Sequence, residues 1–256
     1  PDHLIVIGGG PIGMEMAQAH RRLGSAVTVL EGAKALGKDD PEMAAILLDA
    51  LRGEGIDIRE DTAAQAVRAD GNEIVVETAG GDVRGTHLLL AVGRRVNVEN
   101  LGLDAAGGDF DRRGVKVDAS LRSSNRRVYA VGDAAGGLQF THVAGYHAGV
   151  VIRSLLFGLP SKARTDHIPW TTYTDPELAH VGLTEAQAKE TYGTQTETIR
   201  FPYAHNDRAI AEGKTEGQIK LVVAKGRPVG ATITGAQAGE LISLWALVVA
   251  NRLKMT

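Results

Sequence analysis

The sequence predicts an α/β protein that begins with a parallel sheet and changes to an α+β pattern in its last third. Leu4 to Ile7 is a continuous apolar run that stops at three glycines, which is typical of a strand buried on both faces. Apolar residues then recur at helical spacing as far as Leu23, and Ala26 to Leu30 forms a second apolar run. This order of strand, glycine turn, helix and strand indicates one βαβ unit of a parallel sheet.

The rest of the chain is expected to add helices and strands of both kinds. In the first two thirds we predict a helix at 41–51 and a hairpin with strands at 73–78 and 82–84. We also predict apolar strands at 86–92 and 128–131 and a second long helix at 143–157. The glycine-rich and charged segment 94–124 is interpreted as a connection. After it we predict strands at 168–173, 218–224 and 229–234, and helices at 184–192 and 241–253.

Composition excludes several classes of function for these residues. The 256 residues contain no cysteine, so they provide no disulfide, thiolate metal site or thiol nucleophile. A net charge of -3 gives no long-range attraction to nucleic acid or anionic membrane. His142 and His147 are five residues apart, which is not the helical spacing of a metal pair, and we expect no metal site. No apolar run approaches a membrane span, and we predict a cytoplasmic location.

The strongest local motif is the glycine turn after the first strand, which fits G-x-G-x-x-G with Gly8, Gly10 and Gly13. In a βαβ unit these glycines make the turn, let backbone approach a pyrophosphate, and allow the helix to pack closely on the strand. Glu31 ends the second strand, where an acidic side chain accepts from a ribose hydroxyl and repels a 2′-phosphate. We therefore predict NAD binding, against the alternative of an ordinary turn followed by an exposed glutamate.

Two further carboxylates have more than one interpretation. Glu15 is expected in the first turn of the helix, where it either complements the helix dipole or serves a site. Asp133 ends the predicted strand 128–131, where it either accepts from sugar or ribityl hydroxyls or caps the next turn. The residues alone do not decide either case.

Four stretches of the sequence resemble one family, the flavoprotein disulfide reductases of the dihydrolipoamide dehydrogenase, glutathione reductase and mercuric reductase type. They are G-G-G-P-I-G-M-E-M-A-Q-A at 8–19 with V-T-V-L-E at 27–31, A-V-G-R-R at 91–95, V-Y-A-V-G-D at 128–133, and T-D-P-E-L-A-H-V-G-L-T-E at 174–185. They follow the family's order along the whole chain.

The resemblance implies roles for individual residues. On the nucleotide side these would be pyrophosphate binding, adenine ribose binding and contact with the nicotinamide half, carried by Gly8, Gly10, Pro11, Ile12, Gly13, Glu31 and Gly93. Glu15 resembles the family glutamate beside the nicotinamide amide, which gives it a catalytic role. On the flavin side Asp133 would bind the ribityl chain of FAD, and Thr141 and His142 would bring backbone near the flavin ring.

The resemblance also implies three domains and an activity. Residues 1–93 would form a Rossmann-like NAD-binding domain, 94–160 the returning part of a flavin-binding domain, and 161–256 a truncated interface domain with an antiparallel sheet that supports a homodimer. The family's flavin-binding glycine motif, its cysteine pair and its His–Glu pair have no counterpart here, so we interpret the chain as a fragment.

The intact parent is expected to pass electrons from NADH through FAD to a disulfide or related small acceptor, and the fragment is expected to be inactive and to have lost FAD. The alternatives are a non-catalytic NAD-binding module, or a mercuric-ion or quinone reductase of the same family. Mercuric-reductase-like chains often use NADP, which conflicts with Glu31.

Overall fold

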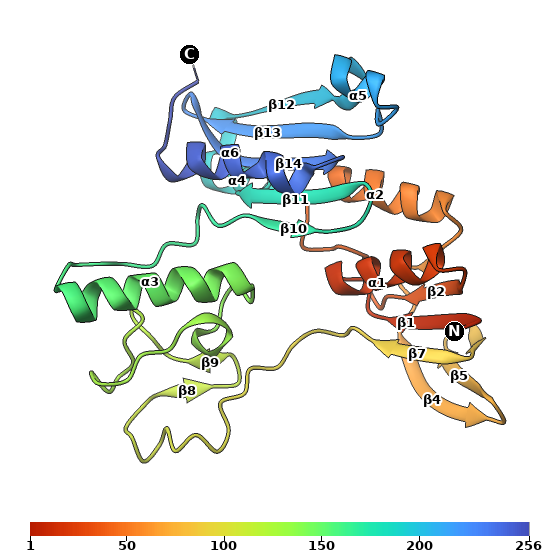
Figure 1. Cartoon of the computed structure of the whole chain (residues 1–256), viewed down its shortest axis with the longest axis horizontal. Helices are drawn as coiled ribbons and strands as arrows, with labels where there is room; N and C mark the ends of the chain where they lie inside the picture. Colours follow the sequence, from red (N-terminus) through yellow and green to blue (C-terminus); the bar gives the residue numbers. More distant parts are fainter. Residues whose placement is uncertain (256) are drawn as a thin grey trace. The chain divides into compact units, whose positions relative to one another are not determined.

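A computed structural model describes residues 1–255 and divides the chain into two compact units (Figure 1). One unit combines Pro1–Gly93 with the segment that begins at Pro169, and the other is Arg94–Ile168. The first unit therefore joins two parts of the chain that are 75 or more residues apart in sequence. None of the helices in residues 1–255 combines the length and the apolar character needed to cross a membrane.

A four-stranded parallel sheet forms the start of the first unit. Its strand order is β3-β2-β1-β7, and every neighbouring pair is parallel. The strands are β1 (His3–Ile7), β2 (Ala26–Leu30), β3 (Asp57–Arg59) and β7 (His87–Leu90). Helix α1 (Pro11–Arg22) connects β1 to β2, and α2 (Pro41–Gly53) leads to β3. The predicted βαβ unit is confirmed.

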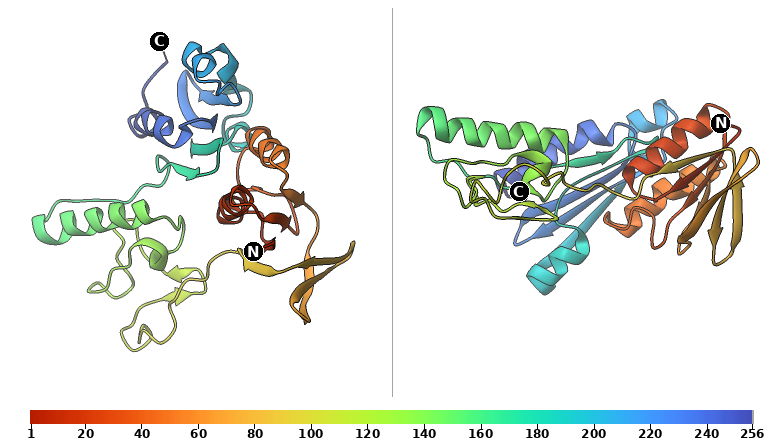
Figure 2. Two further views of the ribbon diagram at one scale, coloured as in Figure 1. Left: turned by 45° about the vertical axis from the view of Figure 1, so that its right-hand side comes forward. Right: turned by 90° about the horizontal axis from the view of Figure 1, so that it is seen from below.

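Both faces of this sheet are covered, which explains the continuous apolar run of β1. Leu4 and Val6 pack in one core with Met14 of α1 and Leu47 of α2. Ile5 faces the other side and packs with Val76 and Val83 of an antiparallel sheet. That sheet is inserted in the chain between β3 and β7 (Figure 2). The strands of that sheet are β4 (Ala64–Asp70), β5 (Glu73–Thr78) and β6 (Gly81–Gly85). The predicted hairpin corresponds to β5 and β6, whereas β4 was not predicted.

A five-stranded antiparallel sheet forms the rest of the first unit, with the order β10-β11-β14-β13-β12. Its strands are β10 (Trp170–Thr172), β11 (Glu177–Gly182), β12 (Thr196–Pro202), β13 (Gln218–Ala224) and β14 (Arg227–Gly235). The helices are α4 (Glu185–Tyr192), α5 (Asp207–Ala211) and α6 (Ala238–Ala250). Ile242 of α6 packs in the same core as Ala179 and Ile233 of the sheet. The predicted capping box of α4 is present, with Thr184 and Gln187 as its partners. The α+β pattern is thus confirmed, while β12 was not predicted and α6 begins three residues before its predicted start.

The second unit contains a short hairpin, a 3-10 turn and one long helix. These are β8 (Phe110–Asp111) with β9 (Gly114–Val115), η1 (Gly132–Ala135), and α3 (Thr141–Phe157). Its core includes Val96, Val98 and Ala130. The interpretation of 94–124 as a mere connection was therefore incomplete, because three of its valines, Val96, Val98 and Val115, are buried in this core.

The strand predicted at 128–131 is wrong. A strand is defined by ladder hydrogen bonds to a neighbour, and the structure gives this segment only an isolated antiparallel bridge between Tyr129 and Arg122. Asp133 consequently does not end a strand. It lies in the first turn of η1, which follows the extended residue Val131.

Candidate functional site

Of the three glycines of the G-x-G-x-x-G motif, two occupy positions that tolerate no side chain and one is open. A Cβ on Gly8 would lie 2.4 Å from the carbonyl oxygen of Ala91, and Gly8 has a φ of +110°. A Cβ on Gly13 would lie 2.0 Å from the carbonyl oxygen of Gly8. A Cβ on Gly10 would meet nothing within 4 Å. Two glycines are thus required by packing, and the third leaves its backbone accessible from outside.

The N-terminus of α1 has no side-chain cap, in contrast to that of α2. Gly10 occupies the cap position of α1 and has no side chain that could cap the helix. Pro11 follows as the first residue of the helix. In α2 the carboxylate of Asp40 accepts from the backbone N–H groups of Glu42 and Met43. Uncapped N–H groups and the positive end of the helix dipole bind anions such as phosphates. Pro11 and Ile12 are exposed beside this terminus.

Glu31 is held beside the glycine turn by two backbone donors. Its Oε2 accepts from the N–H of Gly9 at 2.7 Å, and its Oε1 accepts from the N–H of Ala33 at 2.9 Å. Each carboxylate oxygen has two acceptor positions, so one remains on each oxygen. The structure therefore brings the predicted acidic residue to the predicted turn. Gly9, which makes the contact, was not singled out from the sequence, where it is one glycine of three.

Glu15 does not lie in the first turn of α1, and the interpretation as a helix-dipole partner is wrong. The helix begins at Pro11, its first turn has no acidic residue, and the dipole effect falls off within that turn. Instead, Oε1 of Glu15 accepts from the backbone N–H of Tyr173 at 2.8 Å. The sequence contains no sign of this contact, because the two residues are 158 positions apart.

Gly93 follows the last strand of the parallel sheet. It has a φ of +111°, and a Cβ there would meet nothing within 4 Å. Strands β1 and β7 are parallel neighbours, so the chain after β7 and the glycine turn after β1 leave the sheet at the same edge. Ligands of open α/β sheets bind at this carboxyl edge.

The predicted flavin-side residues are found together in the second unit. Asp133 accepts from Nη1 of Arg94 at 3.4 Å. Thr141 and His142 form the first turn of α3, and the His142 ring stacks on Phe140 with a centroid separation of 5.3 Å.

A buried histidine supports the turn that carries Asp133. The N–H of Gly132 donates to Nδ1 of His147 at 3.2 Å, and burial lowers the pKa of His147. A neutral imidazole can accept at Nδ1, so this ring serves the backbone of the turn.

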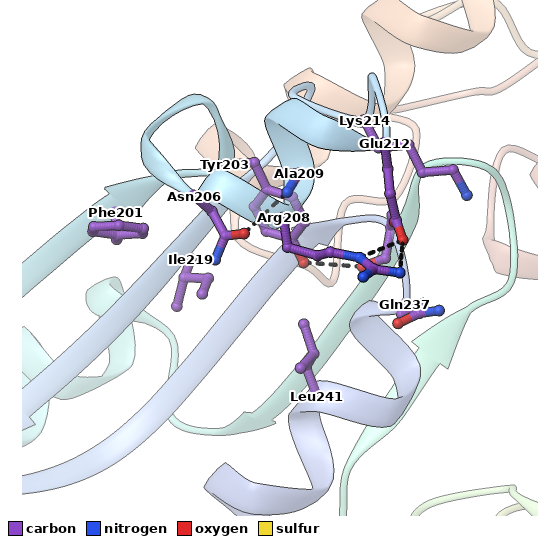
Figure 3. Close-up of a pocket in the computed structure, with 11 residues that line it drawn as sticks. Phe201, Tyr203, Asn206, Arg208, Ala209, Glu212, Lys214, Ile219, Gln237 and Leu241 are labelled. Atoms are coloured by element: carbon purple, nitrogen blue, oxygen red, sulfur yellow. Dashed lines mark hydrogen bonds and ion pairs between the residues drawn. The ribbon is translucent and has the colours of Figure 1, made fainter.

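A separate cavity of about 270 Å³ lies between α5 and α6 on the antiparallel sheet (Figure 3). Tyr203, Ile219 and Leu241 line it, and Arg208 pairs with Glu212 at its rim. None of the predicted site residues lines this cavity.

Comparison with protein families assigns most of the chain. Residues 1–148 match the family described as pyridine nucleotide-disulphide oxidoreductase, and residues 168–256 match the dimerisation domain of the same family. The two matches cover all but 19 residues between them.

Individual relatives agree with this assignment. The chain is 36% identical over 250 residues to a mercuric reductase of Streptomyces lividans, covering 95% of this chain and 52% of that protein. It is 37% identical over 257 residues to a dihydrolipoyl dehydrogenase of Geobacillus stearothermophilus, covering 97% and 54%. The chain thus spans about half the length of the curated relatives it matches.

Solved structures agree in fold. A copper(II) complex of the HOCl-induced flavoprotein disulfide reductase RclA of Escherichia coli has a TM-score of 0.91 and 30% identity, over 99% of this chain and 58% of that one. LpdA of Mycobacterium tuberculosis has a TM-score of 0.92 and 29% identity, over 99% and 56%. Together with the glycine turn and with Glu31, whose carboxylate accepts from the N–H of Gly9 in that turn, these matches show that the chain belongs to the pyridine nucleotide-disulphide oxidoreductase family.

Proposed function

We propose that this chain binds NADH at the carboxyl edge of its parallel sheet. We further propose that the protein to which it belongs passes electrons from NADH through FAD to a disulfide or related small acceptor. The observation that carries the proposal is the pairing of an uncapped helix N-terminus at Gly10 with the carboxylate of Glu31 at the same turn. Family membership supports the use of FAD together with a pyridine nucleotide.

The glycine turn would hold the pyrophosphate of NADH. Gly10 leaves room for the phosphate to reach the backbone, while Gly8 and Gly13 allow the turn and helix to pack closely on Ala91, which follows β7, and on each other. The N–H groups of Ile12 and Gly13, in the first turn of α1, are oriented toward such an anion.

Glu31 would select NADH over NADPH. The N–H groups of Gly9 and Ala33 orient its carboxylate and leave one acceptor position on each oxygen for the two ribose hydroxyls. A 2′-phosphate in that place would be repelled by the carboxylate. Lys34 is three residues away, but its Nζ already pairs with Asp61 at 2.7 Å.

Glu15 and Gly93 would contact the nicotinamide half. One oxygen of Glu15 is bound by the N–H of Tyr173, and the other remains to accept from the nicotinamide carboxamide. NADH supplies the hydride and FAD accepts it when both are bound, and the protein's task is to align them. An anchored carboxylate would orient the nicotinamide ring for that alignment.

Asp133, Thr141 and His142 would serve FAD in the second unit. The carboxylate of Asp133 is half-buried and can accept from ribityl hydroxyls, and Thr141 and His142, at the start of α3, would bring backbone near the flavin ring. We expect FAD to be lost from this chain and disulfide reduction to be absent, because the chain spans about half of its relatives.

Three further proposals concern the assembly, the cellular location and the acceptor. Helix α6 exposes three leucines, Leu241, Leu244 and Leu247, which suits burial in a homodimer through the dimerisation domain. We place the protein in the cytoplasm. For the acceptor, a mercuric ion and a quinone are the alternatives to a disulfide, and the relatives include both mercuric reductases and dihydrolipoyl dehydrogenases.

Titration calorimetry tests the proposal. The purified chain is expected to bind NADH at a single site and to bind NADPH at least about tenfold more weakly, which corresponds to about 1.4 kcal/mol. Heat changes equal to those of buffer for both nucleotides would contradict the proposed site. A chain that binds NADH and also oxidises it steadily with added FAD and a disulfide would contradict the expected inactivity. NADH binding without turnover in a chain extended to the full reading frame would favour the alternative of a non-catalytic NAD-binding module.

A further inference from the structure

One face of α1 forms hydrogen bonds with the segment that connects β10 to β11 in the antiparallel sheet. Glu15, Gln18 and Arg22 follow the spacing i, i+3, i+7, which places them in one row along the helix. All three bind Tyr173 or Asp175, which precede β11. The row therefore joins the helix that follows the glycine turn to a segment more than 150 residues later in the chain.

Gln18 is the central member of this row. Its Nε2 donates to the carbonyl oxygen of Asp175 at 2.7 Å, and its Oε1 accepts from the N–H of Asp175 at 2.9 Å. One side-chain amide thus satisfies both backbone groups of a single residue, which fixes that residue in two directions. Gln18 is 4% exposed, so these bonds are shielded from water.

Glu54 and Arg22 stabilise the same arrangement. Nε2 of Gln18 also donates to Oε1 of Glu54 at 2.8 Å, and Arg22 pairs with Glu54 at 2.7 Å and with Oδ2 of Asp175 at 3.0 Å. The glutamine amide is therefore held by Glu54 at the C-terminal end of α2 as well as by the segment that precedes β11. Its orientation is determined by partners on both sides.

We propose that Gln18 is a positioning residue for Glu15. By holding the backbone of Asp175, Gln18 fixes the position of the Tyr173 N–H two residues earlier, and that N–H orients the Glu15 carboxylate toward the nicotinamide. This inference rests on the proposed role of Glu15 in NADH binding. It makes the orientation of a nucleotide-site carboxylate depend on the dimerisation domain.

A purely structural role for Gln18 makes a different prediction. If the row only joined two parts of the unit, loss of Gln18 would weaken every nucleotide alike or none. A positioning role concerns only the nicotinamide half. ADP-ribose separates the two cases because it contains the adenine, riboses and pyrophosphate of NADH but lacks the nicotinamide ring.

The test is a double-mutant cycle read by calorimetry with NADH and with ADP-ribose. Gln18→Met keeps the side-chain volume and removes the amide, and it is expected to weaken NADH about fivefold while ADP-ribose changes less than about twofold. Glu15→Gln is expected to reduce the NADH to ADP-ribose affinity ratio as well. In the Glu15→Gln background, Gln18→Met should then have no further effect on that ratio.

Controls separate the possible failures. Arg52→Ala removes an exposed ion pair of α2 with Glu60 and should leave both ligands unaffected. If Gln18→Met does not fold, Arg22→Met removes an exposed contact with the same segment and is used in the same cycle. An unchanged ratio in the folded variant, or equal weakening of both ligands, overturns the positioning role alone. A wild-type chain that binds neither ligand overturns the proposed function and this inference together.

Discussion

The ammonium nitrogen of Lys220 lies 2.9 Å and 2.8 Å from the two carboxylate oxygens of Asp40, and both side chains are buried. Asp40 is also the cap of α2, so one carboxylate serves a helix terminus and an ion pair. Glu42 and Glu185 each approach Lys220 to 2.8 Å as well. The ion pair of Asp40 and Lys220 joins the start of α2 to strand β13 of the antiparallel sheet. Burial by itself would lower the pKa of Lys220, but hydrogen bonds to the three carboxylates raise it.

Removing this lysine is expected to destabilise the protein strongly. Lys220→Met leaves Asp40 as a buried carboxylate without its cation, and breaking a buried pair in this way costs about 3–5 kcal/mol. The free energy of unfolding, measured by urea denaturation, should fall by that amount. The matched control is Lys189→Met, which removes an exposed partner of Glu185 and should cost less than about 1 kcal/mol. Equal losses in the two variants would show that Lys220 is not a buried ionic link.

Acid is expected to weaken the same cluster in a defined range of pH. Hydrogen bonds from Lys189 and Lys220 lower the pKa of Glu185 from 4.5 to about 2. Because the folded pKa lies below the unfolded value, the unfolded chain takes up the proton first, and the stabilisation is present above pH 4.5 and lost as the pH falls toward 2. Glu185→Gln should therefore be less stable than wild type at pH 6, and the difference should disappear near pH 2. A difference independent of pH would contradict this assignment.

Two substitutions in the G-x-G-x-x-G motif are expected to separate folding from binding. Gly13→Ala places a methyl group 2.0 Å from a backbone oxygen, and overpacking of this kind costs about 1–3 kcal/mol of stability. Gly10→Ala meets open space at a φ of -78° and should leave stability within about 0.5 kcal/mol of wild type. It should nevertheless weaken NADH about tenfold, because the methyl group occupies the approach to the pyrophosphate. Thermal unfolding and calorimetry measure the two effects, and normal NADH binding by Gly10→Ala would place the nucleotide elsewhere.

A charge reversal at Glu31 is expected to change nucleotide preference. Glu31→Arg removes the acceptor for the ribose hydroxyls and adds a donor for a 2′-phosphate, and charge-assisted contacts of this type are worth about 1.5–3 kcal/mol. The ratio of NADPH to NADH affinity should rise by about tenfold or more. Glu31→Gln, which removes the charge and keeps the shape, should give a smaller rise. An unchanged ratio in both variants would exclude Glu31 as the selecting residue.

Local patterns were sufficient for the parts of the fold that form from neighbouring residues. The strand, turn and helix from Leu4 to Arg22 could be predicted because apolar spacing, glycines and a terminating Gly24 all lie within about 20 residues. The segment 128–131 shows the limit of that reasoning. It has the composition of a strand, yet it pairs only through one bridge, because pairing depends on a partner and not on composition.

The sequence by itself determined the parallel βαβ unit, the glycine turn and the placement of Glu31 at the end of β2. Only the tertiary structure decided that Glu15 bonds to Tyr173 and that Lys220 is a buried ion-pair partner of Asp40. These contacts join residues 158 and 180 positions apart. The physical reason is that each residue type has a fixed charge and hydrogen-bonding capacity. Which partner satisfies that capacity depends on how the two sheets pack together.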